Sequence, residues 1–257
     1  AFSKPFRYDA SVLSVASTVP SAGGAFTLPA PLTLDVNFNE SIAAASVSTD
    51  DLVLSIGTVT GAIALDADTA RYTISGINTE MPINISVDAL KLTDAFGNPN
   101  NGFIGAYQSD IGTIAFPSAL TAGEPVGSLI YEGDYTATVG LAGDTDNFTL
   151  DLDAGQKLGV LITPGTTSLR PSITVTGPGG TNVTNSAAAA GGVAQLQNIP
   201  VTVAGTYTLA VGGASSTTGG YTISAALNTD RESETDTGTP NDTLGAAQDL
   251  TPAFTTL

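Results

Sequence analysis

Hydrophobic and polar residues alternate along most of the chain, which is the pattern of half-buried β-strands. The clearest case is the segment LTLDVNF at residues 32–38, where every second residue is apolar. We predict strands at residues 11–17, 32–38, 50–55, 61–65, 70–75, 83–87, 157–163, 172–176, 205–211 and 220–225. A helical turn is expected only at residues 41–45. The close spacing of the strands predicts an all-β chain built from β-sandwiches.

Glycine, proline, asparagine and aspartate separate the predicted strands. Turns are expected at residues 19–24 (VPSAGG), 92–99 (LTDAFGNP) and 177–180 (GPGG), and residues 187–192 are expected to form a loop or short linker. A chain of 257 residues is long enough for two domains that each bury a core. We place one sandwich at residues 1–110, a second at residues 111–228 and an acidic C-terminal arm at residues 229–257.

The balance of charge limits the possible partners. The chain has 24 acidic and 7 basic residues, and its formal net charge is -17. Proteins that bind nucleic acid neutralise phosphates with Lys and Arg, and here the basic residues are scattered. No apolar run approaches the roughly 18 residues that a membrane-spanning helix needs. We therefore expect neither a nucleic-acid partner nor a transmembrane segment.

The residue types that are absent limit the chemistry. The chain contains no Cys, His or Trp. This removes Ser–His and Cys–His nucleophilic pairs, thiolate sites and imidazole zinc sites. A carboxylate pair such as Glu132 with Asp144 is the remaining option for a glycosidase, but nothing in the sequence predicts the pocket that a general acid needs. We expect the chain not to be an enzyme.

A carboxylate-rich turn that runs directly into an alternating strand, at residues 141–150 (LAGDTDNFTL), is the strongest candidate site. Asp144 and Asp146 are two residues apart, so in an extended segment both carboxylates project to the same side, and Asn147 adds a neutral oxygen. Calcium collects about six to eight oxygen ligands and tolerates the irregular geometry of a loop. The alternative is a turn leading into a strand, in which the Asp side chains cap their own backbone.

The first region carries motifs of a known domain type. In order along the chain they are SVLSVASTVPSAGG, LTLDVNFNESIAAASVSTDDLVLS, ARYTISGI and KLTDAFGNPN. Over about residues 8–110 this order resembles the bacterial immunoglobulin-like domains of S-layer and other surface proteins. The matching residues are Pro20, Phe38, Asn39, Glu40, Asp94, Gly97 and Asn98. The resemblance implies a spacer or adhesive unit.

The second region resembles the bacterial pre-peptidase C-terminal (PPC) domain, a β-sandwich appended to secreted peptidases and large surface proteins. The similar segments are GDTDNFTLDLDAGQKLGVLI, PSITVTGPGGTNV and AGTYTLAVGGASSTTGGYTISAAL. The residues that match structural positions of the family, with the aromatic ones expected in the core, are Phe148, Gly155, Gly205, Tyr207, Gly219 and Tyr221.

The same resemblance implies calcium ligands. In the PPC family, a G-D-x-D-x-F turn can contribute ligands together with an acidic E-P-N-D segment at the start of the domain. Asp144 and Asp146 match the turn. No E-P-N-D precedes them in this chain; residues 123–126 read GEPV, and Glu132 and Asp134 stand nearer the turn.

The C-terminal arm looks like the opening of another copy of the same domain. Residues 230–236 read DRESETD, and residues 239–250 read TPNDTLGAAQDL. Either a longer modular array continues from here, or the arm folds back or onto a neighbouring molecule. The alternative is a solvated acidic linker. The arm adds these candidate calcium ligands: Glu232, Glu234, Asp236, Asn241 and Asp242.

These patterns together predict a non-catalytic structural or adhesive module of a secreted or cell-surface bacterial protein, with calcium as the suspected metal. The expected partners are other copies or other domains of the same surface protein, as in a filament or S-layer, with residues 1–8 or the arm adding a strand to a neighbour. The alternative function is an accessory module of a secreted hydrolase that targets polysaccharide or protein fibres. No aromatic platform for such a polymer stands out.

Overall fold

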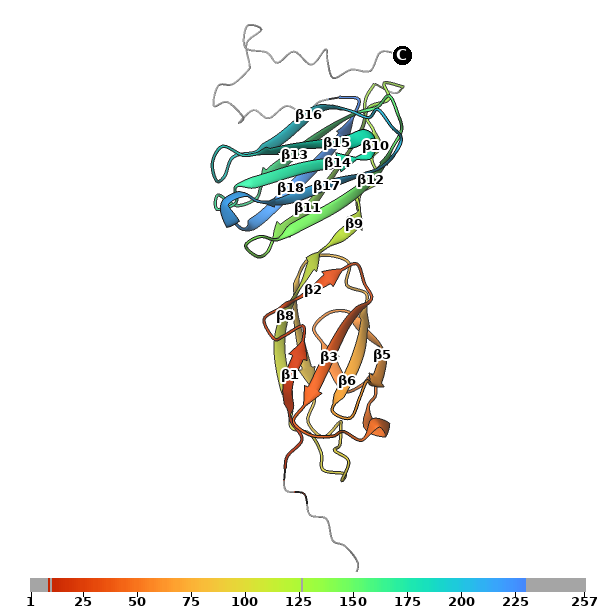
Figure 1. The fold of residues 1–257 in the computed structure, drawn as a ribbon, viewed down its shortest axis with the longest axis vertical. Coiled ribbons are helices and arrows are strands. Elements are labelled where there is room, and N and C mark those ends of the chain that lie inside the picture. Colours follow the sequence, from red (N-terminus) through yellow and green to blue (C-terminus); the bar gives the residue numbers. More distant parts are fainter. Residues whose placement is uncertain (1–8, 10, 126, 230–257) are drawn as a thin grey trace, which may run out of the picture. The chain divides into compact units, whose positions relative to one another are not determined.

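The chain forms two compact units in which nearly all regular structure is β-strand (Figure 1). The computed structural model describes residue 9, residues 11–125 and residues 127–229. The first unit ends at Asp110 and the second begins at Ile111. The described helical segments are three short 3₁₀ turns, Ala44–Ser46, Pro178–Gly180 and Ala214–Ser216. The prediction of an all-β chain with sandwich-like sheets is confirmed. Among the described residues, no helix has the length and apolar character needed to cross a membrane.

The first unit consists of two four-stranded sheets. One has the order β1 (Val15–Val19), β3 (Leu32–Phe38), β6 (Thr69–Ser75), β5 (Thr58–Ala64). The other has the order β2 (Ala25–Leu28), β8 (Phe103–Ile111), β7 (Pro82–Val87), β4 (Leu52–Leu54). Strand β3 pairs antiparallel with β1 and β6, and β7 pairs antiparallel with β4 and β8.

The core of the first unit follows directly from the alternating pattern. Every second residue of β3 is buried, beginning at Leu32, and β7 buries Ile83, Ile85 and Val87 in the same way. Removing these side chains from water supplies the main driving force for folding. Tyr107 of β8 also lies in this core, where its hydroxyl is hydrogen-bonded to Thr18 Oγ1 at 2.8 Å.

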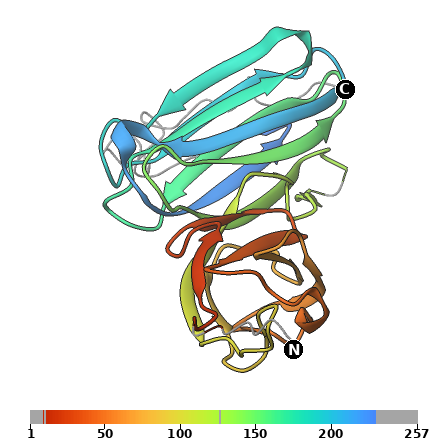
Figure 2. The same cartoon turned by 60° about the horizontal axis from the view of Figure 1, so that its bottom comes forward.

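The second unit consists of two five-stranded sheets, whose strands run alongside one another in Figure 2. One has the order β10 (Thr121–Ala122), β11 (Tyr131–Val139), β18 (Gly219–Leu227), β13 (Lys157–Pro164), β16 (Ala194–Pro200). The other has the order β15 (Thr181–Ser186), β14 (Pro171–Gly177), β17 (Gly205–Gly213), β12 (Thr145–Leu152), β9 (Thr113–Ala115). Only the β12–β9 pair is parallel among these described pairs.

Aromatic rings mark the centre of the second unit. Phe148 of β12 is completely buried, and its ring meets Phe116 and Tyr135 edge-on at centroid distances of 5.9 and 5.7 Å. Tyr207 of β17 and Tyr221 of β18 are also buried. The expected placement of Phe148, Tyr207 and Tyr221 in the core is confirmed.

Several strands were not predicted, because their sequences lack a clear apolar alternation. Strand β15 reads TNVTNS and is almost entirely polar and exposed. Strand β11 reads YEGDYTATV, where a glycine and two acidic residues interrupt the pattern. Strands β2, β8, β9, β10 and β16 were also missed. The helical turn expected at residues 41–45 is a 3₁₀ turn at Ala44–Ser46, and residues 187–192 form a loop between β15 and β16.

Candidate functional site

Asp144 closes the turn between β11 and β12. It directly precedes β12, and its Oδ2 atom accepts a hydrogen bond from the backbone N–H of Gly140 at 2.9 Å. The backbone N–H of Asp144 donates in turn to the carbonyl oxygen of Leu141 at 3.1 Å. These contacts match the interpretation in which the aspartate caps its own turn.

Asp146 points in a different direction, into the interior of the second unit. It lies on β12, is completely buried, and is on the same face of the strand as Phe148. The hydroxyl group of Tyr221, on β18 of the other sheet, donates to Asp146 Oδ2 at 2.6 Å. Asp146 therefore takes part in a polar contact that links the two sheets through the core.

The other predicted ligands of the second unit lie elsewhere. Asn147 faces away from Asp146, and its Nδ2 atom donates to the carbonyl oxygen of Gly112 at 3.0 Å. Glu132 and Asp134 lie on the face of β11 opposite Tyr135 and line a surface depression of about 300 Å³. The structure thus brings Glu132 near Asp134 but does not gather them with Asp144 and Asp146. Calcium binding at this turn stays a prediction.

The C-terminal part of the predicted ligand set cannot be placed. Five candidate ligands lie outside the described residues, namely Glu232, Glu234, Asp236, Asn241 and Asp242. Residues 1–8 and the arm, which were predicted to add a strand to a neighbour, also lie outside them.

In the first unit, Asp51 is an almost fully buried carboxylate. Its Oδ2 atom accepts hydrogen bonds from the backbone N–H of Ser48 at 2.7 Å and from the hydroxyl of Tyr72 at 3.0 Å. Burial raises the pKa of Asp51, although both hydrogen bonds act in the opposite direction. Burial and the nearby Asp51 carboxylate raise the pKa of Tyr72. Through these two hydrogen bonds, Asp51 holds the segment before β4 against the core.

Asp94 organises the turn that contains the D-x-x-G-N motif. Its Oδ1 atom accepts the backbone N–H groups of Phe96 and Asn98 at 2.8 and 2.7 Å, and its Oδ2 atom accepts Nδ2 of Asn98 at 2.7 Å. Gly97 has a φ of 93°, a conformation that glycine adopts without strain. Although burial alone would raise it, the hydrogen bonds from Asn98 and Phe96 lower the pKa of Asp94.

Asn39, the middle residue of the F-N-E motif, holds the beginning of the described chain in place. Its Oδ1 atom accepts the N–H of Ser14 at 2.7 Å, and its Nδ2 atom donates to the carbonyl oxygen of Val12 at 3.1 Å. On the other side, the N–H of Asn101 donates to the carbonyl oxygen of Leu13 at 2.8 Å. Residues 12–14 are therefore fixed between the end of β3 and the segment after the Asp94 turn.

Three carboxylates lie close together near the end of β3 and the Asp94 turn. This group was not identified from the sequence. One oxygen from each of Asp9, Glu40 and Asp94 lies within 4.8 Å of the other two. Burial raises the pKa of Glu40, followed in order by the charge of Asp9, a side-chain hydrogen bond with Asp9 and the charge of Asp94. Glu40 and Asp94 were identified only as residues matching the resembled domain type. Asp9 precedes the first predicted strand, so no spacing rule connected it with them.

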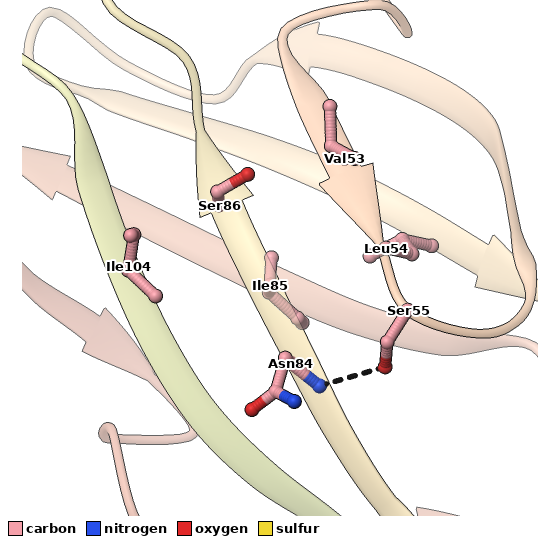
Figure 3. Close-up of a pocket in the computed structure, with 7 residues that line it drawn as sticks. All are labelled: Val53, Leu54, Ser55, Asn84, Ile85, Ser86 and Ile104. Carbon is pink, nitrogen blue, oxygen red and sulfur yellow. Dashed lines mark hydrogen bonds between the residues drawn. The ribbon is translucent and has the colours of Figure 1, made fainter.

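A shallow depression lies on the second sheet of the first unit (Figure 3). It has a volume of about 250 Å³ and is lined by Val53, Leu54, Ser55, Asn84, Ile85, Ser86 and Ile104. The backbone N–H of Asn84 donates to Ser55 Oγ at 2.9 Å, which joins two of these lining residues. Val53 and Ile104 are exposed. The lining is uncharged, so it offers contact area but no acid or base.

No family model matches the chain, and comparison with curated proteins gives no match. Similar solved structures include the N-terminal part of the bacterial S-layer protein SbsC, at 11% identity and a TM-score of 0.31, over 39% of this chain and 24% of that one. Another is PliG of Aeromonas hydrophila, a periplasmic inhibitor of g-type lysozyme, at 19% identity and a TM-score of 0.31, over 46% of this chain and 96% of that one. A third is SGBP-B of the Bacteroides ovatus mixed-linkage glucan utilization locus, at 14% identity and a TM-score of 0.24, over 86% of this chain and 52% of that one. The chain spans about a quarter of the SbsC structure, and none of these likenesses is close enough to show a family.

Proposed function

We propose that this chain is a non-catalytic structural module of an extracellular, cell-surface protein. The observation that carries the proposal is the use of acidic side chains as acceptors within the fold. Asp51, Asp94 and Asp144 each accept a hydrogen bond from a backbone N–H of a nearby residue. A carboxylate held in this way is oriented by the turn that it closes, whereas acid–base catalysis needs a group positioned against a substrate.

The motifs in the first unit support the same role. Asn39 and Asp94 belong to the segments that resemble immunoglobulin-like domains of bacterial surface proteins. Asn39 ties residues 12–14 to the end of β3, and Asp94 closes its own turn. Domains of that type serve as spacers or adhesive units. The resemblance of the second region to PPC domains, which occur in secreted proteins, agrees with an extracellular location.

The proposal extends to partners and metal. The partners are other copies or other domains of the same surface protein, and calcium stiffens the module. The strongly negative net charge favours cations in the surrounding solvent and keeps separate molecules apart at low ionic strength. In the second unit Asp144 remains a proposed calcium ligand, whereas Asp146 is buried in the core and points away from Asp144.

A second candidate function is an accessory module that binds polysaccharide or protein fibres. The uncharged depression on β4, β7 and β8 favours it, because its lining combines the exposed Val53 and Ile104 with the polar groups of Ser55 and Asn84. Such a surface offers apolar contact together with hydrogen-bonding groups.

A co-sedimentation experiment separates the two functions. The purified chain is mixed with cellulose, chitin, peptidoglycan or collagen fibres, and the pellet and any released sugars or peptides are measured. If the role is structural, the pellet should contain no more of this chain than of an unrelated acidic protein. No sugar or peptide should be released. Retention that Ile104→Ser abolishes would favour the accessory role. Product release that is lost in Glu132→Gln or Asp144→Asn would overturn the non-catalytic assignment.

A further inference from the structure

Three segments that are distant in sequence converge at one end of the first unit. Residues 41–43 lie beside residues 93–95: the N–H of Ala43 donates to the carbonyl oxygen of Thr93 at 2.8 Å, and the N–H of Ala95 donates to that of Ser41 at 3.0 Å. Residues 12–14 join them through the Asn39 side chain and Asn101. Asp94 lies within residues 93–95, Glu40 directly precedes residues 41–43, and Asp9 precedes residues 12–14.

Neighbouring contacts set the positions of two of the three carboxylates, those of Asp9 and Asp94. Asp9 Oδ1 accepts the N–H of Ser11 at 2.9 Å, and Asp94 is held by the N–H groups of its own turn. Glu40 follows Asn39 directly at the end of β3. Two of the three carboxylates are therefore held in place before any ligand arrives, which lowers the entropic cost of binding.

Glu40 supplies the second observation. Its Oε1 atom is shielded from solvent and has no hydrogen-bond partner among the described residues. A shielded carboxylate oxygen without a donor is unfavourable, and the carboxylates of Asp9 and Asp94 add repulsion. A cation would relieve both costs at once, because it coordinates the oxygen and offsets the negative charges.

We propose that Asp9, Glu40 and Asp94 form a calcium-binding site that ties the beginning of the described chain to the end of β3 and to the D-x-x-G-N turn. The donor set contains only oxygen, which suits a hard cation. Calcium accepts irregular oxygen coordination completed by water, whereas magnesium requires a near-ideal octahedron and gives up its own water reluctantly. This site is separate from the predicted calcium turn at Asp144 and Asp146.

Calorimetric titration of the full chain with calcium tests this site. The wild-type chain is expected to bind calcium, and Glu40→Gln and Asp9→Asn are each expected to weaken binding at this site at least about tenfold. Asp88→Asn is the matched control, because Asp88 is an exposed acidic residue of the same unit outside the group. It should leave the affinity unchanged. No binding heat with wild-type protein, or equal affinity in Glu40→Gln and Asp9→Asn, would overturn the proposal.

Thermal melts distinguish loss of the site from loss of the fold. In chelator, Glu40→Gln should melt no lower than wild type, because the substitution removes repulsion within the group. In calcium, the wild-type melting temperature should rise and that of Glu40→Gln should not, since a ligand that binds the folded state stabilises it. A calcium-dependent rise abolished only by Asp144→Ala/Asp146→Ala would assign the metal to the second unit and contradict this site. Neither outcome depends on the polymer-binding experiment, so the site and the structural role can fail separately.

Discussion

At the scale of single residues, each unit contains a buried tyrosine that donates to a buried aspartate. Tyr72 donates to Asp51 in the first unit, and Tyr221 donates to Asp146 in the second. A hydrogen bond to a charged acceptor is stronger than a neutral one, and leaving the acceptor without its donor exposes the full cost of burying it. These pairs give core aspartates a role in stability.

Replacing Tyr221 with Phe should therefore destabilise the chain more than replacing Tyr207 with Phe. Tyr207 donates to the neutral carbonyl oxygen of Val203 at 2.9 Å, so its removal should cost about 1 kcal/mol. Removal of the Tyr221 hydroxyl from a buried carboxylate should cost about 2–3 kcal/mol. Unfolding in urea, followed by circular dichroism, measures both. Equal losses would show that Asp146 does not depend on this donor.

Asp51 should make stability depend on pH. Its pKa in the folded chain lies above the ordinary value of 3.8, so the folded state retains a proton in a range where the unfolded state has lost it. The resulting stabilisation is complete below about pH 3.8 and is lost as the pH rises through the folded-state pKa. Each unit of pKa difference corresponds to about 1.4 kcal/mol.

The Asp51→Asn variant isolates this contribution, because asparagine keeps an acceptor oxygen but does not titrate. Its free energy of unfolding relative to wild type should increase as the pH is raised from about 4 toward neutrality. Denaturant titrations at a series of pH values measure the difference. A difference that is constant with pH, or that falls as pH rises, would contradict the effect of burial on Asp51.

The sequence predicted which residue types form the core better than it predicted where the carboxylates point. Phe148, Tyr207 and Tyr221 lie on strands whose residues alternate between the core and the surface, and all three are buried as expected. Asp144 and Asp146 were expected to project to one side. They diverge because the extended backbone of β12 begins at Thr145, after Asp144. A spacing rule for strands does not apply across the boundary between a turn and a strand.

At the scale of elements, a close approach between β14 and β17 requires a glycine. A Cβ atom added at Gly177 would lie 2.3 Å from the ring of Tyr207, which is completely buried. Gly177→Ala should therefore cost about 1–3 kcal/mol through overpacking.

Gly220→Ala provides the matched control for this substitution. Gly220 also lies in a strand, and an added Cβ would meet nothing closer than 3.8 Å. That variant should be neutral or slightly more stable, because alanine reduces the freedom of the unfolded chain. Chemical unfolding of both variants tests the comparison; equal stability of Gly177→Ala and wild type would mean that the Tyr207 ring can move aside.

Strands were predictable where one face is apolar and the other polar. The expected range of β3, residues 32–38, agrees with the structure because its alternation is regular. β15 could not be recognised from hydrophobicity, since its backbone hydrogen bonds to β14 hold a polar, exposed sequence at the edge of a sheet. Its pairing depends on tertiary context, which a local pattern does not contain.

At the scale of the whole molecule, the sequence indicated two all-β regions, and the structure has two compact β units. Sequence reasoning placed all candidate metal ligands in the second region and the arm. The group of Asp9, Glu40 and Asp94 could not be found in that way, because its members are brought together only by the folding of the first unit. Glu40 and Asp94 were identified only as residues that match immunoglobulin-like domains, and they were not considered as metal ligands.

Hydrogen exchange of the full chain in calcium and in chelator tests most directly whether the acidic residues of the first unit brace a structural module. The account predicts slower exchange in calcium for backbone amides in residues 11–14, 39–43 and 93–101, because the ion would join these three segments. The effect should disappear in Glu40→Gln and persist in Asp88→Asn. Identical exchange of these segments with and without calcium would contradict the account.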